Sequence, residues 1–417
     1  MIIGNYDKAE KLYTKLLKRS REKLGENDPN VLAAMQGLAC TYYRQGKYND
    51  AEVLFKQCLD KRKVVLGENH RDTLDTMGNL ATTYGYQGRH SDAEILLKQC
   101  LHKLKVVLGD RHSSTLNTMH NLANTYNEQA KYNDAEVLYK QCLAISEVLG
   151  ENHQLTISTM SNLAGTYNDQ GKHSDAEALY KQCLDKRKVV IGESHPDTLR
   201  IEYNLALIYG YQGKYNDAEV LYKQCLDKMM IVLTDSHPFT LMTMRNLAVT
   251  YGYQGKYNDA EVLFKQCLDK MMIVLRENHL DTLSTMNDLA NTYHQQEKYN
   301  DAEVLWKQCL DKRMIVLTDS HPDTLKTMHN LAIAYGRQGK YNDAEDLFKQ
   351  CLDKRKMVLG DNHPQTLTTM NSLEAIYKIL GKHEEAEDLV KQRDSWMDEP
   401  LEQVSKLQPK KSKKGKR

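Results

Sequence analysis

Cysteine and histidine, two residue types that often carry protein chemistry, recur at a nearly constant spacing along this chain of 417 residues. Each series advances by 42 residues, with a single step of 41. Such a fixed period is typical of a repeat array, so these side chains can act together only if the repeats bring them close. The two series are Cys58, Cys100, Cys142, Cys183, Cys225, Cys267, Cys309 and Cys351, and His70, His112, His153, His195, His237, His279, His321 and His363.

The spacing of the repeats argues against metal, disulfide or redox chemistry at these positions. Stacked helices lie about 8–10 Å apart, so equivalent residues two helices apart are roughly 16–20 Å apart. Zinc ligands must lie about 2.0–2.3 Å from one ion, and the Cα atoms of a disulfide within about 7 Å. We therefore expect reduced, buried cysteines, histidines in the turn ahead of a helix, no metal and no cofactor.

No catalytic arrangement emerges from the rest of the sequence. It contains no glycine-rich phosphate loop, no HExxH and no GxSxG pattern. The histidines, cysteines and carboxylates recur in register, as residues that maintain a fold do. The sequence therefore predicts a protein that is not an enzyme.

Two amphipathic helices per repeat must position these residues. In the first helix of one copy, 73–87, apolar side chains fall three and four residues apart, as on one face of a helix. The second helix of a copy is expected at 50–66. Asn49 with Glu52 has the form of a capping box. Glycines such as Gly88 are expected to end the first helices in a left-handed conformation, although Ala130 and Glu297 replace this glycine in two copies.

The repeated stretch KYNDAEVLYKQCLDK, followed by TLxTMxNLAxxY, resembles the tetratricopeptide repeat, in the 42-residue form found in kinesin light chains and nephrocystin-3-like proteins. The resemblance covers almost the whole chain. It implies an all-α fold, a right-handed superhelical solenoid of antiparallel helix pairs. We expect a half-repeat (second helix only) at 1–25, the tandem array at 26–397 and a basic, disordered tail at 398–417. The 41-residue step, within 143–150, should change the local curvature.

The resemblance also implies a function, a scaffold or adaptor that binds extended peptide segments of other proteins in its concave groove. An asparagine one residue before Leu-Ala lines that groove in the family, and an amide can donate to and accept from a peptide backbone. The alternative is that each amide binds the neighbouring repeat. The asparagines concerned are Asn79, Asn121, Asn162, Asn204, Asn246 and Asn330.

Differences between the copies concentrate on the first helix, at positions that the family exposes in the groove. The residue before the asparagine varies as Gly78, His120, Ser161, Tyr203, Arg245, Asn287, His329 and Asn371, and the residue after Leu-Ala as Thr82, Asn124, Gly165, Leu207, Val249, Asn291 and Ile333. We interpret them as ligand-contacting, with neutral drift as the alternative. Because cationic and tyrosine side chains gather in copies five to eight, we expect an acidic peptide with an aromatic anchor there, bound by Arg200, Tyr203, Tyr211, Arg245, Tyr253, Lys326 and Arg337.

Other functions stay open on weaker grounds. Met229, Met230, Met271 and Met272 could form a patch for self-association or could pack on the next repeat. The chain could be the ligand-sensing array of a larger signalling protein. A net charge of +1 argues against nucleic-acid binding.

No stretch is apolar enough to insert into a membrane, so a cytoplasmic protein is expected. Entry into the nucleus through the basic tail is the alternative.

Overall fold

The computed structural model describes residues 3–146 and 150–397, which form 19 α-helices and no strands. The helices are α1 (Ile3–Leu24), α2 (Pro29–Arg44), α3 (Tyr48–Val65), α4 (Arg71–Tyr86), α5 (His90–Leu108), α6 (Ser113–Glu128), α7 (Tyr132–Ser146), α8 (Gln154–Asp169), α9 (His173–Ile191), α10 (Pro196–Tyr211), α11 (Tyr215–Val232), α12 (Pro238–Tyr253), α13 (Tyr257–Val274), α14 (Leu280–Gln295), α15 (Tyr299–Val316), α16 (Pro322–Arg337), α17 (Tyr341–Leu359), α18 (Pro364–Ile379) and α19 (His383–Met397). Even-numbered helices are the first helices of the repeats, and odd-numbered helices are the second.

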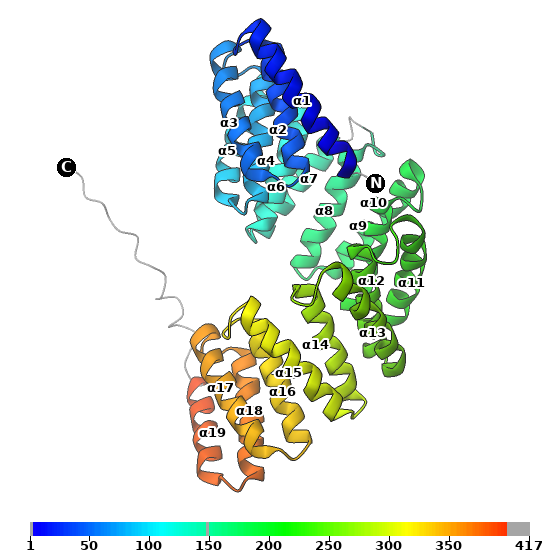
Figure 1. The fold of residues 1–417 in the computed structure, drawn as a ribbon, viewed down its shortest axis with the longest axis vertical. Helices are drawn as coiled ribbons and strands as arrows, with labels where there is room; N and C mark the ends of the chain where they lie inside the picture. Colours follow the sequence, from blue (N-terminus) through cyan, green and yellow to red (C-terminus); the bar gives the residue numbers. More distant parts are fainter. Residues whose placement is uncertain (1–2, 147–149, 398–417) are drawn as a thin grey trace, which may run out of the picture. The chain divides into compact units, whose positions relative to one another are not determined.

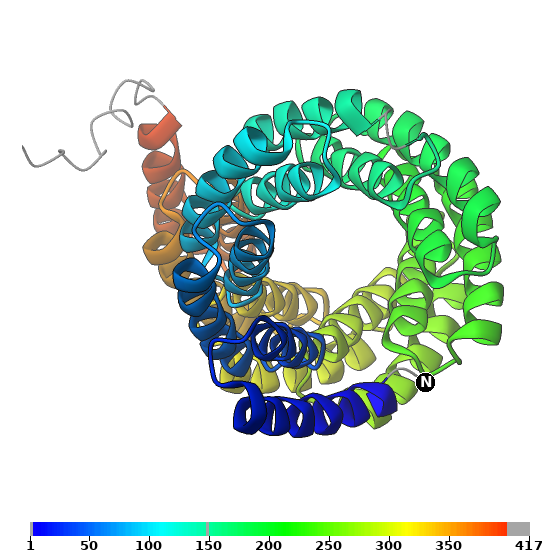
Figure 2. The same cartoon turned by 90° about the horizontal axis from the view of Figure 1, so that it is seen from above.

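The chain divides into two compact units, up to Lys214 and from Tyr215 onward. Within each unit every helix packs against the next in sequence, and most successive first helices also meet (Figure 1). First and second helices thus form two layers in each unit (Figure 2). The predicted all-α solenoid of helix pairs is confirmed. The basic tail and part of the 41-residue step lie outside the described residues.

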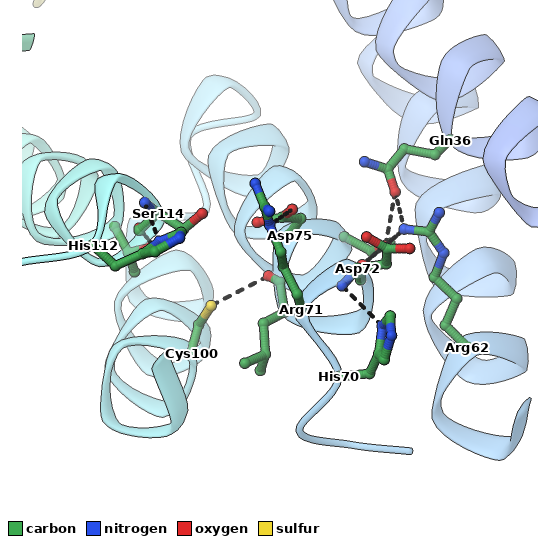
Figure 3. Close-up of polar contacts among 12 residues, drawn as sticks. Gln36, Arg62, His70, Arg71, Asp72, Asp75, Cys100, His112 and Ser114 are labelled. Carbon is green, nitrogen blue, oxygen red and sulfur yellow. Dashed lines mark hydrogen bonds and ion pairs between the residues drawn. The ribbon is translucent and has the colours of Figure 1, made fainter. Parts of the chain in front are cut away.

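The histidine series caps the first helices. The His70 Nδ1 accepts a hydrogen bond from the backbone N–H of Asp72 at 3.2 Å (Figure 3), and the other seven histidines make the same contact. This bond satisfies one of the free N–H groups at a helix start. The structural interpretation of the histidines is therefore confirmed.

The cysteines of the repeats are buried where a second helix crosses the first helix before it. The Cys100 Sγ lies 3.3 Å from the carbonyl oxygen of Leu74 and is fully buried (Figure 3). A thiol is small enough for this close crossing and can donate a weak hydrogen bond. The expected burial of these residues is confirmed.

The capping-box prediction for the second helices is wrong. The helix α3 begins at Tyr48, and no side chain caps it. Glu52 turns instead toward cations, accepting from Lys56 at 2.6 Å and from Arg89 of the next repeat at 2.9 Å. Two charge-assisted bonds outweigh one bond to a backbone N–H.

The first helices end as predicted, in a residue with positive φ. Gly46 has φ 76° and Gly88 has φ 75°. Ala130 and Glu297 adopt the same conformation, with φ 57° and 62°, although a Cβ atom is strained there. The fold thus imposes this turn on residues that do not favour it.

Replacing Glu297 with glycine is expected to raise the free energy of unfolding by about 1 kcal/mol, because it removes this strain. The matched change Gly88→Ala should lower it by a similar amount. Urea denaturation followed by circular dichroism measures both. Equal stability of wild type and Glu297→Gly would contradict the strain argument.

The methionines of copies five and six divide into buried and partly exposed members. Met229 and Met271 are buried, and their sulfur atoms lie 3.3 Å from the hydroxyls of Thr243 and Thr285 on the following first helices. At the same position in other copies, buried arginines such as Arg62 bind the equivalent threonine. For these two methionines the packing alternative holds.

Candidate functional site

The first unit contains a concave cavity of about 790 Å³. Its wall is built mainly from four successive first helices, α4, α6, α8 and α10. Side chains of the second helices close its floor, among them Tyr139 and Tyr180. The period of 42 residues places the same face of each first helix on this wall, so neighbouring repeats present equivalent side chains in a row.

Polar, mostly uncharged side chains dominate the lining. Among the residues predicted from the sequence, Asn121, Asn162, Asn204 and Arg200 line the cavity. The remaining predicted residues are not part of its lining: Asn79, Tyr203 and Tyr211 in the first unit, and Asn246, Asn330, Arg245, Tyr253, Lys326 and Arg337 in the second. The cavity therefore lies mainly in the copies before those in which the sequence predicted acidic-peptide binding.

Three of the six asparagine amides bind the neighbouring repeat, as the alternative interpretation expected. Asn121 donates to the Thr82 hydroxyl at 3.4 Å, and Asn162 donates to Asn124 at 2.7 Å. In the second unit Asn330 donates to Asn291 at 3.1 Å. An amide nitrogen has two hydrogens, so the bonds of Asn121 and Asn330 link the repeats and leave a second hydrogen for a ligand. The Asn162 amide nitrogen also lies 3.4 Å from the His120 Nε2.

In several copies the variable residue before the asparagine position is buried against the protein interior, whereas Ser161 at the same position lines the cavity. His120 is packed edge-on against Tyr139, and His329 against Phe348, each 19 residues further along the chain. Burial lowers the pKa of His120 to about 4. The pKa of His329 is also lowered to about 4, mainly by burial and to a smaller extent by the charge of Arg355. Tyr203, at the same position, is only 8% exposed. Variation here adjusts the packing between helices.

The predicted cationic residues are in different environments. Arg200, at the start of α10, is largely exposed and lies 3.6 Å from Asp197. Arg245 is half-buried and donates through Nε and Nη2 to Asp288 at 2.9 and 2.7 Å. Asp288 stands at the asparagine position of the next copy, so this copy offers Arg245 a carboxylate. Lys326 and Arg337 are exposed toward opposite ends of α16. Of these four, Arg200 alone meets the described cavity.

Two of the three predicted tyrosines, Tyr211 and Tyr253, are exposed at the ends of first helices. The Tyr211 ring is stacked on His173 with centroids 5.4 Å apart, and the Tyr253 ring on Tyr215 at 5.1 Å. His173 begins α9 and Tyr215 begins α11, which are the second helices that precede these first helices in the chain. These contacts hold the rings at the rim of the first-helix layer.

A glutamate, two cations and a tyrosine join consecutive repeats, an arrangement that we call the glutamate clamp. In one clamp, Glu94 accepts from Lys98 at 2.6 Å and from Lys131 of the next repeat at 2.7 Å, and both amines lie over the Tyr126 ring. Burial raises the pKa of Glu94, but the bonds from Lys131, Lys98 and Gln129 outweigh it and lower the pKa to about 2. The clamp therefore holds the repeats in register.

Comparison with known proteins gives a family model for the tetratricopeptide repeat that matches residues 1–63, 54–102, 104–148, 114–188, 155–230, 197–273, 240–313, 281–357 and 323–393. No curated protein matches the sequence. None of the described helices is long and apolar enough to cross a membrane.

Solved structures show similar arrays. The tetratricopeptide repeat sensor protein of the signal-transduction ATPase class from Pyrococcus horikoshii has a TM-score of 0.61 at 15% identity, over 84% of this chain and 53% of that one. The quorum sensor NprR from B. thuringiensis has a TM-score of 0.59 at 16% identity, over 88% and 99%. A Podospora anserina protein described as a kinesin light chain with nearly identical repeats has 26% identity and a TM-score of 0.45, over 49% and 96%.

At these identities the two longer alignments support the fold alone. The family model, in contrast, spans nearly the entire sequence in overlapping matches. The cysteine, histidine and glycine series occupy equivalent structural positions in successive copies. On this evidence the chain belongs to the tetratricopeptide repeat family.

Proposed function

We propose that the protein is an interaction scaffold that binds an extended peptide segment of a partner protein against the concave wall of the first unit. The observation that carries this proposal is the cavity of about 790 Å³, open along α4, α6, α8 and α10 and lined by amide, hydroxyl and aromatic groups. An extended backbone offers N–H and C=O groups along its length, which such a lining can match.

The lining suits a peptide better than a small apolar ligand. The amide nitrogens of Asn121 and Asn162 contact side chains of the neighbouring repeat, which fixes their orientation before a ligand arrives. Fixed side chains lose little conformational freedom on binding. Arg200 at one side of the cavity supplies a guanidinium for a carboxylate of the peptide. In this proposal the acidic preference depends on Arg200, since Arg245 is already paired with Asp288.

A peptide library selected on the full chain tests the proposal. Enriched peptides, measured by fluorescence polarisation, are expected to bind Thr82→Leu at least ten-fold more weakly, because this change fills the α4 side of the cavity and removes an acceptor. Leu207 shows that a first helix accepts leucine at this position. Val106→Thr, at an exposed site on α5, should bind like wild type. Equal binding by all three proteins would refute a concave site.

A further inference from the structure

Amide side chains on the wall of the first unit follow a rule that one copy breaks. Of the three asparagines before Leu-Ala that line the cavity, two donate to the side-chain oxygen of the residue that follows Leu-Ala in the repeat before. Asn121 binds Thr82, and Asn162 binds Asn124 in this way. For Asn204 the corresponding residue is Gly165, which has no side chain and offers no such oxygen.

Gly165 leaves a notch in the wall of the cavity. A Cβ atom built on this residue would lie 3.5 Å from the hydroxyl of Tyr180, and that hydroxyl is the single neighbour within 4 Å. Gly165 lies inside α8, with ordinary helical backbone, where glycine is a poor helix former. Neither backbone conformation nor crowding therefore requires glycine here.

The preceding copy shows what the notch lacks. There the Asn124 Oδ1 accepts from both the Tyr139 hydroxyl and the Asn162 amide. In the Gly165 copy the two corresponding donors are Tyr180 and Asn204, and both line the cavity. The Tyr180 side chain is only 4% exposed. Burial raises the pKa of Tyr180, and a hydrogen bond with the Asn204 side chain opposes that rise.

We propose, on the basis of the proposed peptide site, that the notch formed by Gly165, Tyr180 and Asn204 is a subsite for an asparagine or glutamine side chain of the bound peptide. The amide oxygen of that residue takes the place that Asn124 Oδ1 occupies one repeat earlier. It accepts one hydrogen bond from the Tyr180 hydroxyl and one from the Asn204 amide. The contact supplies sequence specificity, since a buried donor left without an acceptor is costly.

A neutral amide suits the notch better than a carboxylate. Asp169 lies one helical turn beyond Gly165 on α8, and Arg200 lies one turn before Asn204 on α10. Both charges act on Tyr180, and the effect of Asp169 on its pKa exceeds the effect of Arg200. An anion in the notch would thus meet repulsion from Asp169. The NH₂ group of an amide can instead donate to that carboxylate or to the Ser161 hydroxyl.

The variant Gly165→Asn tests the subsite, because it fills the notch with the residue that Asn124 provides in the preceding copy. Among peptides enriched on wild type, those with a single asparagine or glutamine are expected to bind Gly165→Asn at least ten-fold more weakly. The same peptides with alanine in place of that residue should bind both proteins equally. Gly78→Asn is the matched control, since Gly78 lies in α4 outside the cavity lining with open space around it. Thermal unfolding of each variant verifies the fold.

The outcomes separate the subsite from the peptide site. If binding is weakened by Thr82→Leu but peptides show no amide preference and no specific loss in Gly165→Asn, the subsite is refuted and the concave site stands. If peptides with an aspartate or glutamate in place of the asparagine or glutamine bind wild type more tightly, the notch is an anion site and the inference is wrong. If Thr82→Leu and Gly165→Asn both bind every enriched peptide like wild type, both proposals fail.

Discussion

Replacing Glu94 with glutamine is expected to lower the free energy of unfolding by about 1–2 kcal/mol at pH 7 and to leave it unchanged near pH 2. At neutral pH the carboxylate holds Lys98 and Lys131 together, and hydrogen bonds to charged groups contribute on this scale. The ordinary pKa of 4.5 is lowered to about 2 in the fold. The stabilisation is therefore complete above about pH 4.5 and is lost as the pH falls toward 2.

The same titration affects the whole array. Glutamates of six clamps have a pKa lowered to about 2, namely Glu52, Glu94, Glu136, Glu177, Glu219 and Glu261. We expect the midpoint of urea denaturation to fall steeply between pH 4.5 and pH 2. Glu384→Gln, an exposed glutamate at the start of α19, is the control and should match wild type at pH 7. A Glu94→Gln penalty that is the same at pH 7 and pH 2 would contradict the clamp.

Truncating Trp306 to alanine is expected to lower the free energy of unfolding by about 3–5 kcal/mol. The indole is 1% exposed, and its loss leaves a large cavity in the core of the second unit. It also removes the donor that binds the Asn287 Oδ1 at 3.2 Å, in a place where Asn287 is only 3% exposed. An acceptor left alone in the core adds to the cost.

Another copy within the chain provides the control for this prediction. His329 is packed against Phe348 at the positions that Asn287 and Trp306 occupy one repeat earlier. Trp306→Phe alone should cost about 1–3 kcal/mol, because Asn287 loses its donor. The double change Asn287→His with Trp306→Phe should recover most of that loss. Additive effects in this double-mutant cycle, measured by urea denaturation, would show that the two residues are not coupled.

Much of the fold could be predicted because the sequence repeats its own constraints. The position of each histidine ahead of a helix and of each glycine after one follows from local backbone chemistry, which a single sequence displays. The cysteines could be identified as core residues from their spacing alone. These features depend on neighbours within one repeat, so the same sequence signal recurs in every copy.

The site was predicted less well because side-chain direction depends on contacts between helices. His120 and His329 vary between copies, as ligand-contacting residues do, yet they face the second helix 19 residues later. A comparison of the variable pairs 120 with 139, 287 with 306 and 329 with 348 could have revealed this, since the partners change together. The sequence showed that position 165 varies between copies. Its role could not be predicted, because only the fold brings Tyr180 and Asn204 next to Gly165.

The glutamate clamp has a consequence for how such a chain can change over generations. Each glutamate clamp uses a glutamate and a lysine from one repeat and a cation from the next, and these residues are nearly identical from copy to copy. A duplication or deletion of one whole 42-residue segment would therefore create a junction that is already compatible. The length of the binding wall can change by whole repeats in a single genetic event, whereas the residues that give each copy its own specificity change one at a time.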